Sequence, residues 1–155
     1  MGGLSHSELA DICVRADWPR KAGIIQRRGN DYFWQGAQAD DRRILIANGK
    51  PLPISGSASL TMHQTSPLSN AAIVKLRPPH RFNEHVDGVV LVEDTLLVGP
   101  QPDCQIRCHQ LDDRAVLTRR GERWMGKAAA TNEFEELKPG NRTMLRSLAM
   151  TLEKA

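Results

Sequence analysis

Two loop positions in this sequence carry the residues best suited to bind a ligand. Arg20 and Lys21 stand together in a polar stretch between two apolar segments. Such a pair can hold an anion, and the planar guanidinium matches two oxygens of a phosphate. Asn48-Gly49 is either a ligand-contacting turn or a plain hairpin turn, because both residues accept the backbone of a tight turn. Arg20, Lys21, Asn48 and Gly49 are therefore the candidate ligand-binding residues, with solvated loop charges as the alternative for the two cations.

Two further clusters have side chains that metals use. Residues 104–109 read Cys-x-x-x-Cys-His, but this spacing does not fit a common zinc pattern and lacks a convincing fourth ligand. Residues 80–85 contain two histidines and a glutamate in a proline-rich stretch, where solvated side chains are the simpler interpretation. We predict no metal site and no cofactor.

Motifs of the common enzyme classes are absent from the sequence. It contains no G-x-x-x-x-G-K-[ST] loop, no G-x-S-x-G elbow and no H-E-x-x-H helix. The paired acids at 112–113 and 135–136 would point to opposite faces of a strand, so neither pair converges on one substrate atom. We predict a protein without catalytic residues.

Composition narrows the class of protein further. A length of 155 residues fits one ordinary domain or two small ones, and 40% hydrophobic residues suffice for a core. The sequence has neither an apolar run of about 18 residues nor a secretory signal, so we expect no membrane contact. Three cysteines favour a reducing, cytoplasmic setting. A net charge of only +3, with 5% aromatic residues, does not favour nucleic-acid binding.

The apolar pattern is that of short strands broken by Gly, Pro, Asn and Asp, which is typical of an all-β sandwich or barrel. The predicted strands are 11–15, 22–27, 31–35, 43–47, 59–62, 71–76, 88–93, 95–99, 105–108, 115–119, 123–127, 143–145 and 148–152. Two segments also fit a helix: residues 143–154, by their apolar spacing, and a short segment that Ser5 or Ser7 could cap.

An internal repeat links the two halves of the chain. Residues 10–36 and 103–127 each contain an Ile-centred strand, a polar loop with one arginine, an apolar strand ending in Arg-Arg-Gly, and a tryptophan two residues before a glycine. This similarity indicates two copies of one module, places Trp34 and Trp124 at equivalent core positions, and favours a strand for residues 143–154. Two strands precede the second copy only, so the first is predicted to lack its initial strands. It must then borrow strands, pair with another chain, or belong to a longer protein.

These residues resemble a pair of divergent bacterial forkhead-associated (FHA) modules. In that family a strand ends in Gly-Arg, the next reads Asp-Ile-x-Leu, Ser-Arg-x-His follows, and an Asn-Gly turn comes later. The matching positions here are 11–14, 56–62, 98–99, 105–106, Arg20, Arg114 and Asn48-Gly49. The resemblance implies an FHA-like β-sandwich whose ancestor bound phosphothreonine peptides in kinase signalling.

The departures from that pattern affect the phosphate site of both copies. In the second copy Pro100 replaces the arginine of Gly-Arg, and Asp113 replaces the serine, where an acid repels a phosphate dianion. In the first copy Pro19 and Ala22 replace the serine and the histidine. The resemblance therefore implies that phosphothreonine binding is lost or altered, and that any affinity left lies at Arg20 and Lys21 beside Asn48-Gly49.

Taken together, the sequence predicts a first FHA-like unit over residues 1–79, a linker over 80–87 and a second unit over 88–155. We expect a non-enzymatic protein-interaction module in signalling or scaffolding, with a protein or phosphopeptide as partner. The alternative is a structural or assembly protein that forms homo-oligomers through exposed β-edges.

Overall fold

The computed structural model describes residues 2–3, 11–38, 40–66, 69–83, 86 and 88–153. All regular secondary structure in these residues is β-strand, which confirms the all-β class and is consistent with a sandwich. The helix considered at Ser5 and Ser7 lies outside the described residues.

The chain divides into two compact units. Unit 1 comprises Met1–His63 and Ile73–Val90, and unit 2 comprises Gln64–Ala72 and Leu91–Ala155. These units are defined by spatial contacts, so the predicted division into two sequence-related copies stays a prediction.

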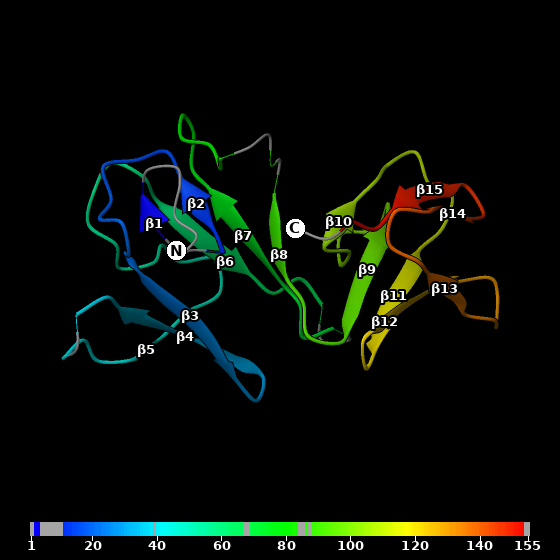
Figure 1. Cartoon of the computed structure of the whole chain (residues 1–155), viewed down its shortest axis with the longest axis horizontal. Helices are drawn as coiled ribbons and strands as arrows, with labels where there is room; N and C mark the ends of the chain where they lie inside the picture. The colour runs from blue at the N-terminus through cyan, green and yellow to red at the C-terminus, as the bar shows by residue number, and fades with distance from the viewer. Residues whose placement is uncertain are drawn as a thin grey trace. The chain divides into compact units, whose positions relative to one another are not determined.

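The described strands of unit 1 form two three-stranded sheets and one parallel pair (Figure 1). Its strands are β1 (Gly2–Gly3), β2 (Cys13–Val14), β3 (Gly23–Arg28), β4 (Asp31–Gly36), β5 (Ile44–Leu45), β6 (Leu60–His63), β7 (Ala72–Leu76) and β8 (Val89–Leu91). One sheet has the order β3-β4-β5 and the other β6-β7-β8, while β1 and β2 pair in parallel. The core contains Val14, Trp18, Tyr32, Trp34, Leu52, Leu60, Met62 and Val74.

A tight hairpin joins β3 to β4. Gly29 begins its two-residue turn with φ +60°, a backbone that glycine adopts without strain. At the other end of the hairpin, Gly23 lies opposite Gly36, and a Cβ on Gly23 would collide with the ring of Trp34. Glycine at position 23 thus lets the buried tryptophan pack against the neighbouring strand.

The segment predicted as a linker is in part ordered against β2. Phe82 forms a β-bridge with Val14, and the Asn83 amide donates to the Cys13 carbonyl at 3.1 Å. Pro78 and Pro79 do end the pairing of β7, as expected of residues without an N–H. The chain then turns back and pairs again, which the local sequence did not indicate.

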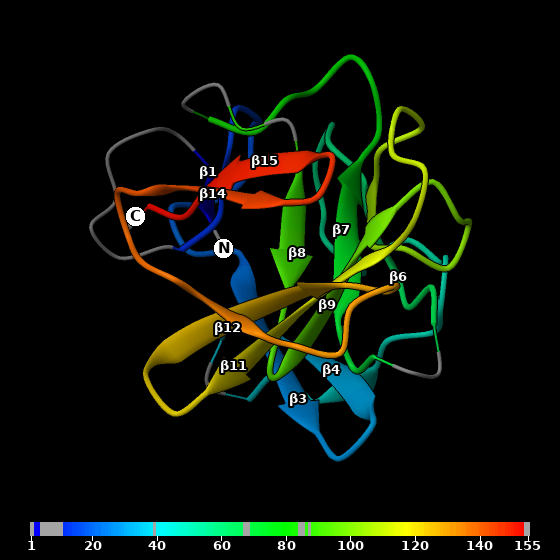
Figure 2. The same cartoon turned by 90° about the vertical axis from the view of Figure 1, so that its right-hand side faces the viewer.

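Unit 2 is built around a five-stranded sheet of order β10-β9-β11-β12-β13. Its strands are β9 (Thr95–Gly99), β10 (Ile106–Arg107), β11 (Ala115–Arg120), β12 (Arg123–Ala128), β13 (Glu135–Leu137), β14 (Arg142–Leu145) and β15 (Leu148–Thr151). Figure 2 shows β9, β11 and β12 side by side, with the β14–β15 hairpin in the same unit. The preference for strands over a helix in the C-terminal segment is confirmed.

Leu145 of β14 packs on the five-stranded sheet at Gly126. A Cβ on Gly126 would lie 2.7 Å from Leu145 Cδ1 and 3.1 Å from Leu117 Cδ2. The missing side chain therefore makes room for the hairpin, and Leu117, Leu137 and Leu145 are all buried.

The described residues between β6 and β7, 64–66 and 69–71, belong to unit 2, and polar contacts hold Thr65 and Ser69 there. The buried Gln105 side chain accepts a hydrogen bond from the Leu97 amide at 2.8 Å and donates to Thr65 Oγ1 at 3.0 Å. Thr65 Oγ1 in turn donates to the Asp103 carbonyl, and the Ser69 hydroxyl donates to the carbonyl of Thr95. Buried polar groups need such partners, so this network fixes the segment beside β9 and β10.

The β3–β4 and β11–β12 hairpins have the same construction. Both pair two six-residue strands across a two-residue turn that begins with glycine at φ +60° or +61°. In this common register Trp124 stands where unit 1 has Tyr32, and Gly126 stands where unit 1 has Trp34. The predicted equivalence of the two tryptophans is therefore wrong: Trp34 is buried in its core, whereas Trp124 is half-buried at another position.

Candidate functional site

The loop before β3 presents two free cations. Arg20 and Lys21 are exposed, and in the described part of the chain neither forms a hydrogen bond or an ion pair. Their charges are therefore available to a partner, and the anion site at these two residues stays a prediction.

The Asn48-Gly49 dipeptide forms a β-turn that links the two sheets of unit 1. The Lys50 amide donates to the Ala47 carbonyl at 3.0 Å, and Gly49 has φ +71°. The Gly49 amide donates to the Met62 carbonyl at 2.8 Å. After β5, the chain therefore stops pairing with β4 and begins to pair with β6. The predicted turn is present, but its two arms belong to different sheets and it does not close a hairpin.

The strand register places these two loops at opposite ends of the β3-β4-β5 sheet. Arg20 and Lys21 precede Gly23, which pairs with Gly36 at the end of β4. The chain after β5 runs the other way, because the Ile46 amide donates to the Tyr32 carbonyl near the start of β4. The ends of the six-residue β3 are roughly 17 Å apart at about 3.3 Å per residue.

In unit 2 the arginine of the corresponding loop is already paired. Arg114 Nη1 lies 3.0 Å from Asp103 Oδ2, and both side chains are largely shielded from solvent at 25% and 31% exposure. The Asp113 carboxylate accepts a hydrogen bond from the Arg114 backbone amide at 2.7 Å, so a second acid lies beside the backbone of the same arginine. An incoming phosphate would have to displace one carboxylate and approach another.

The common hairpin register also shows which residue of unit 1 corresponds to Arg114. Arg114 directly precedes β11, and the residue that directly precedes β3 is Ala22, which is buried. Arg20 lies two residues further out in the loop. The sequence alignment of Arg20 with Arg114 therefore differs from the structural one, and unit 1 has no cation at this position.

A hydrogen-bonded aspartate, not singled out from the sequence, holds the loop that carries Arg20. Asp17 Oδ1 accepts the amide and the hydroxyl of Ser57, each at 2.7 Å. These hydrogen bonds, that of the Ser57 amide foremost, lower the pKa of the Asp17 carboxyl below its usual value. Trp18 packs in the core beside Gly56, so residues 17–18 form a firm base for the exposed Arg20.

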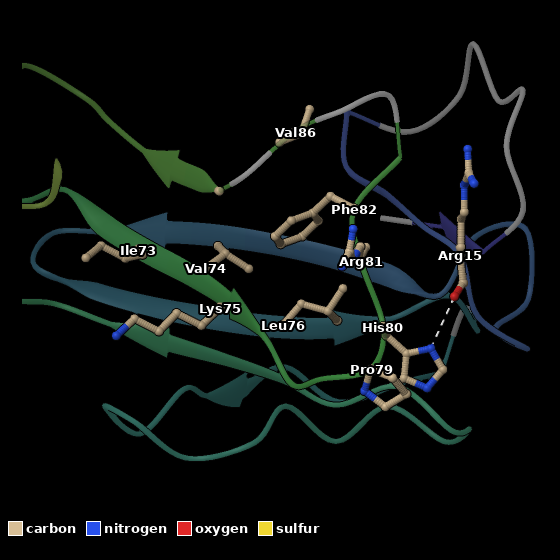
Figure 3. A pocket seen from close by; sticks show the side chains of 11 residues that line it. Arg15, Ile73, Val74, Lys75, Leu76, Pro79, His80, Arg81, Phe82 and Val86 are labelled. Atoms are coloured by element: carbon tan, nitrogen blue, oxygen red, sulfur yellow. Dashed lines mark hydrogen bonds between the residues drawn. The ribbon is translucent and has the colours of Figure 1, made fainter. Parts of the chain in front are cut away.

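A groove of about 1020 Å³ runs along β7 in unit 1 (Figure 3). Its described lining is basic and apolar, with Arg15, Lys75 and Arg81 among the cations. Figure 3 shows that the Arg15 and Lys75 side chains point away from one another, toward opposite ends of the groove. The His80 ring is held by the Arg15 carbonyl at 3.2 Å. The cations thus do not converge on one point, as a compact anion site would require.

The cysteines do not form a metal cluster. Among the described residues, no group of three His, Cys, Asp or Glu side chains is placed to hold a metal ion. Cys104 is buried, and burial is the main cause that raises the pKa of its thiol, so the reactive thiolate is disfavoured.

Comparisons with known proteins return no match for this chain: no family model, no curated protein and no solved structure is similar to it. Within the described residues, no helix has the length and apolar character needed to cross a membrane.

Proposed function

We propose that this chain is a non-enzymatic protein-interaction module of FHA-like fold in which phosphothreonine recognition is lost or altered. The ion pair between Arg114 and Asp103 is the observation that carries the proposal. Arg114 directly precedes the second hairpin, and because its guanidinium is already paired with a carboxylate it is not available to a phosphate. In unit 1 the same position holds the buried Ala22.

Two structural parallels support the FHA-like, repeated architecture. The two hairpins share strand length, turn and register, although their sequences differ at most positions. Parallel pairing recurs as well, between β1 and β2 in unit 1 and between β9 and β10 in unit 2.

The test is a titration of the ¹⁵N-labelled full chain with a phosphothreonine peptide library and its unphosphorylated counterpart. Lost recognition predicts equal, weak responses to both sets. Phosphate-dependent shifts at Arg20 and Lys21 that disappear in Arg20→Ala would instead show an altered site that survives in unit 1. Phosphate-dependent shifts at Arg114 in the unmodified chain would contradict the proposal.

The second candidate is an assembly protein that oligomerises through β-edges, and exposed aliphatic residues of unit 1 favour it. Ile24, Ile44 and Leu45 are 41%, 49% and 56% exposed on the sheet that carries β3. The strand that corresponds to β5 in unit 2 carries Glu135 and Glu136, both exposed. Light scattering over a range of concentrations distinguishes the two functions, because a monomer at high concentration excludes self-assembly.

A further inference from the structure

A pocket of about 110 Å³ lies in unit 2, between the β14–β15 hairpin (Figure 2) and the loop that leads into β11. Its floor is aliphatic, because Leu111, Ala115, Ala128 and Leu145 line it and all four are buried. Apolar cavities of about 150 Å³ hold a benzene ring, so a pocket of this volume has room for one branched aliphatic side chain.

The pocket exists because unit 2 lacks the tryptophan that fills the corresponding space in unit 1. In the common register Ala115 stands where unit 1 has Gly23, and the ring of Trp34 packs against Gly23. Unit 2 has Gly126 in place of Trp34. Leu145 covers Gly126, where a Cβ would lie 2.7 Å from its Cδ1, but the space beside Ala115 stays open.

Arg146 stands at the pocket with a strained backbone. It begins the two-residue turn between β14 and β15, and with φ +55° it is the only residue other than glycine that has a positive φ in the described part of the chain. The β3–β4 and β11–β12 turns have glycine at this place, Gly29 and Gly121. Since a side chain is disfavoured in the left-handed region, the sequence keeps an arginine where glycine would be more stable.

The Arg146 side chain makes no contact that offsets this strain. It is exposed, and within the described residues it forms neither a hydrogen bond nor an ion pair. The other cation that lines the pocket, Arg114, is paired with Asp103. Of the two acids that line it, Asp113 already accepts the Arg114 amide, whereas Asp112 is exposed and has no partner in the described residues. The pocket therefore offers one available cation and one available carboxylate above an aliphatic floor.

This combination matches the last residue of a protein chain. Such a residue carries its side chain, a terminal carboxylate and a backbone N–H on the same Cα. An aliphatic side chain fits the floor, the carboxylate can form a bidentate pair with the guanidinium of Arg146, and the N–H can donate to Asp112. A residue in the middle of a chain has no carboxylate on its backbone and would leave Arg146 unpaired.

We propose that unit 2 binds the C-terminal residue of a partner protein, an aliphatic residue whose terminal carboxylate pairs with Arg146. This inference rests on the proposed interaction function and specifies its partner. It needs neither a phosphate nor the guanidinium of Arg114, so failure of the phosphopeptide titration and failure here are distinct results.

The test is a titration of the ¹⁵N-labelled full chain with the peptide acetyl-Gly-Gly-Ser-Leu, once with a free C-terminal carboxylate and once with a C-terminal amide. The free acid is expected to give saturable shifts of the amides of residues 145–148. The amidated peptide should bind at least about tenfold more weakly, because it loses the charged hydrogen bonds to Arg146.

Matched variants separate the roles of the cation and the floor. Arg146→Gln should weaken binding of the free acid at least about tenfold, whereas Arg142→Gln, which removes an exposed cation outside the pocket lining, should leave it unchanged. Ala128→Val fills the floor and should abolish the saturable shifts, while Ala149→Val, at an exposed position of β15, should not.

A glycine variant tests whether the strained arginine is kept for binding. Arg146→Gly should raise the ratio of folded to unfolded unit 2 roughly fivefold, because it removes the strain, and should weaken binding as Arg146→Gln does. Four results would overturn the proposal: no saturable shifts, equal affinity for the acid and the amide, unchanged affinity in Arg146→Gln, or free leucine binding as tightly as the peptide. The last would assign the pocket to a small molecule.

Discussion

The β3–β4 and β11–β12 hairpins are built alike but stand in different surroundings. Each ends its first strand in two arginines and turns on a glycine with positive φ. β11 pairs with a strand on both edges, and its Leu117 is 3% exposed, whereas among the described strands β3 pairs with β4 alone, with Ile25 half-buried and Ile24 exposed. Local sequence thus sets the hairpin, while the neighbouring strands decide how deeply its central side chain is buried.

The largest expected difference between the hairpins is the cost of removing the central aliphatic side chain. Leu117→Ala should destabilise unit 2 by about 2–5 kcal/mol, because it leaves a cavity under Leu145. Ile25→Ala, at the equivalent but half-buried position, should cost unit 1 only about 1–2 kcal/mol. Urea unfolding followed on amides of each unit measures both, and equal costs would contradict the difference in coverage.

The turns should behave identically. Gly29→Ala and Gly121→Ala each place a Cβ in open space at positive φ, so strain is the whole effect, at about 1 kcal/mol in each unit. The same unfolding experiment applies. A loss of stability in only one of the two units would show that the two turns are not structurally equivalent.

The ion pair of unit 2 should contribute little to stability. Asp103→Asn removes a partly exposed pair and should lower the free energy of unfolding by less than about 1 kcal/mol. It also frees Arg114, so phosphothreonine peptides should now shift the Arg114 amide more than unphosphorylated ones do. Asp112→Asn, which removes an exposed neighbouring acid, is the control. The same phosphate response in that variant would show that the ion pair with Asp103 is not what keeps phosphate from Arg114.

The smallest effect is confined to acid solution and to unit 1. Because hydrogen bonds from Ser57 lower the pKa of Asp17 in the folded chain, the stability they confer is present above the ordinary pKa of an aspartate and is lost as the pH falls through the lowered value. Ser57→Ala should make unit 1 less sensitive to acid below about pH 4 and leave unit 2 unchanged. An unaltered acid profile of unit 1 would show that the Asp17–Ser57 contact is not kept in solution.

Local pattern was enough to predict the all-β class and both Arg-Arg-Gly hairpins, because alternation and turn glycines act over a few residues. The C-terminal strands were also predicted. Their apolar pattern fits either a helix or a strand, and the internal repeat favoured the strand. The prediction that Trp34 and Trp124 are equivalent was wrong because it relied on the Trp-x-Gly spacing that both segments share. Equivalent positions are set by the strand register, which counts residues from the turn.

Contacts between distant segments could not be predicted from the sequence. The hydrogen bonds that join Thr65 to Gln105 and Asp103 involve ordinary polar residues about forty positions apart, and no local pattern marks them. For the same reason, the sequence grouped Arg20 and Lys21 with Asn48-Gly49. The direction of β5, which separates the two loops, is visible only from its pairing with β4.

The most direct test of the account is native-state hydrogen exchange of two amides in the unmodified chain. Ile25 and Leu117 occupy equivalent positions, but among the described strands only Leu117 has a neighbour on the edge away from the hairpin, where it pairs with Leu96 of β9. We expect the Leu117 amide to exchange only when unit 2 unfolds, and the Ile25 amide to exchange while unit 1 stays folded. Equal protection of the two amides in a dilute, monomeric sample would contradict the difference in strand coverage between the two hairpins.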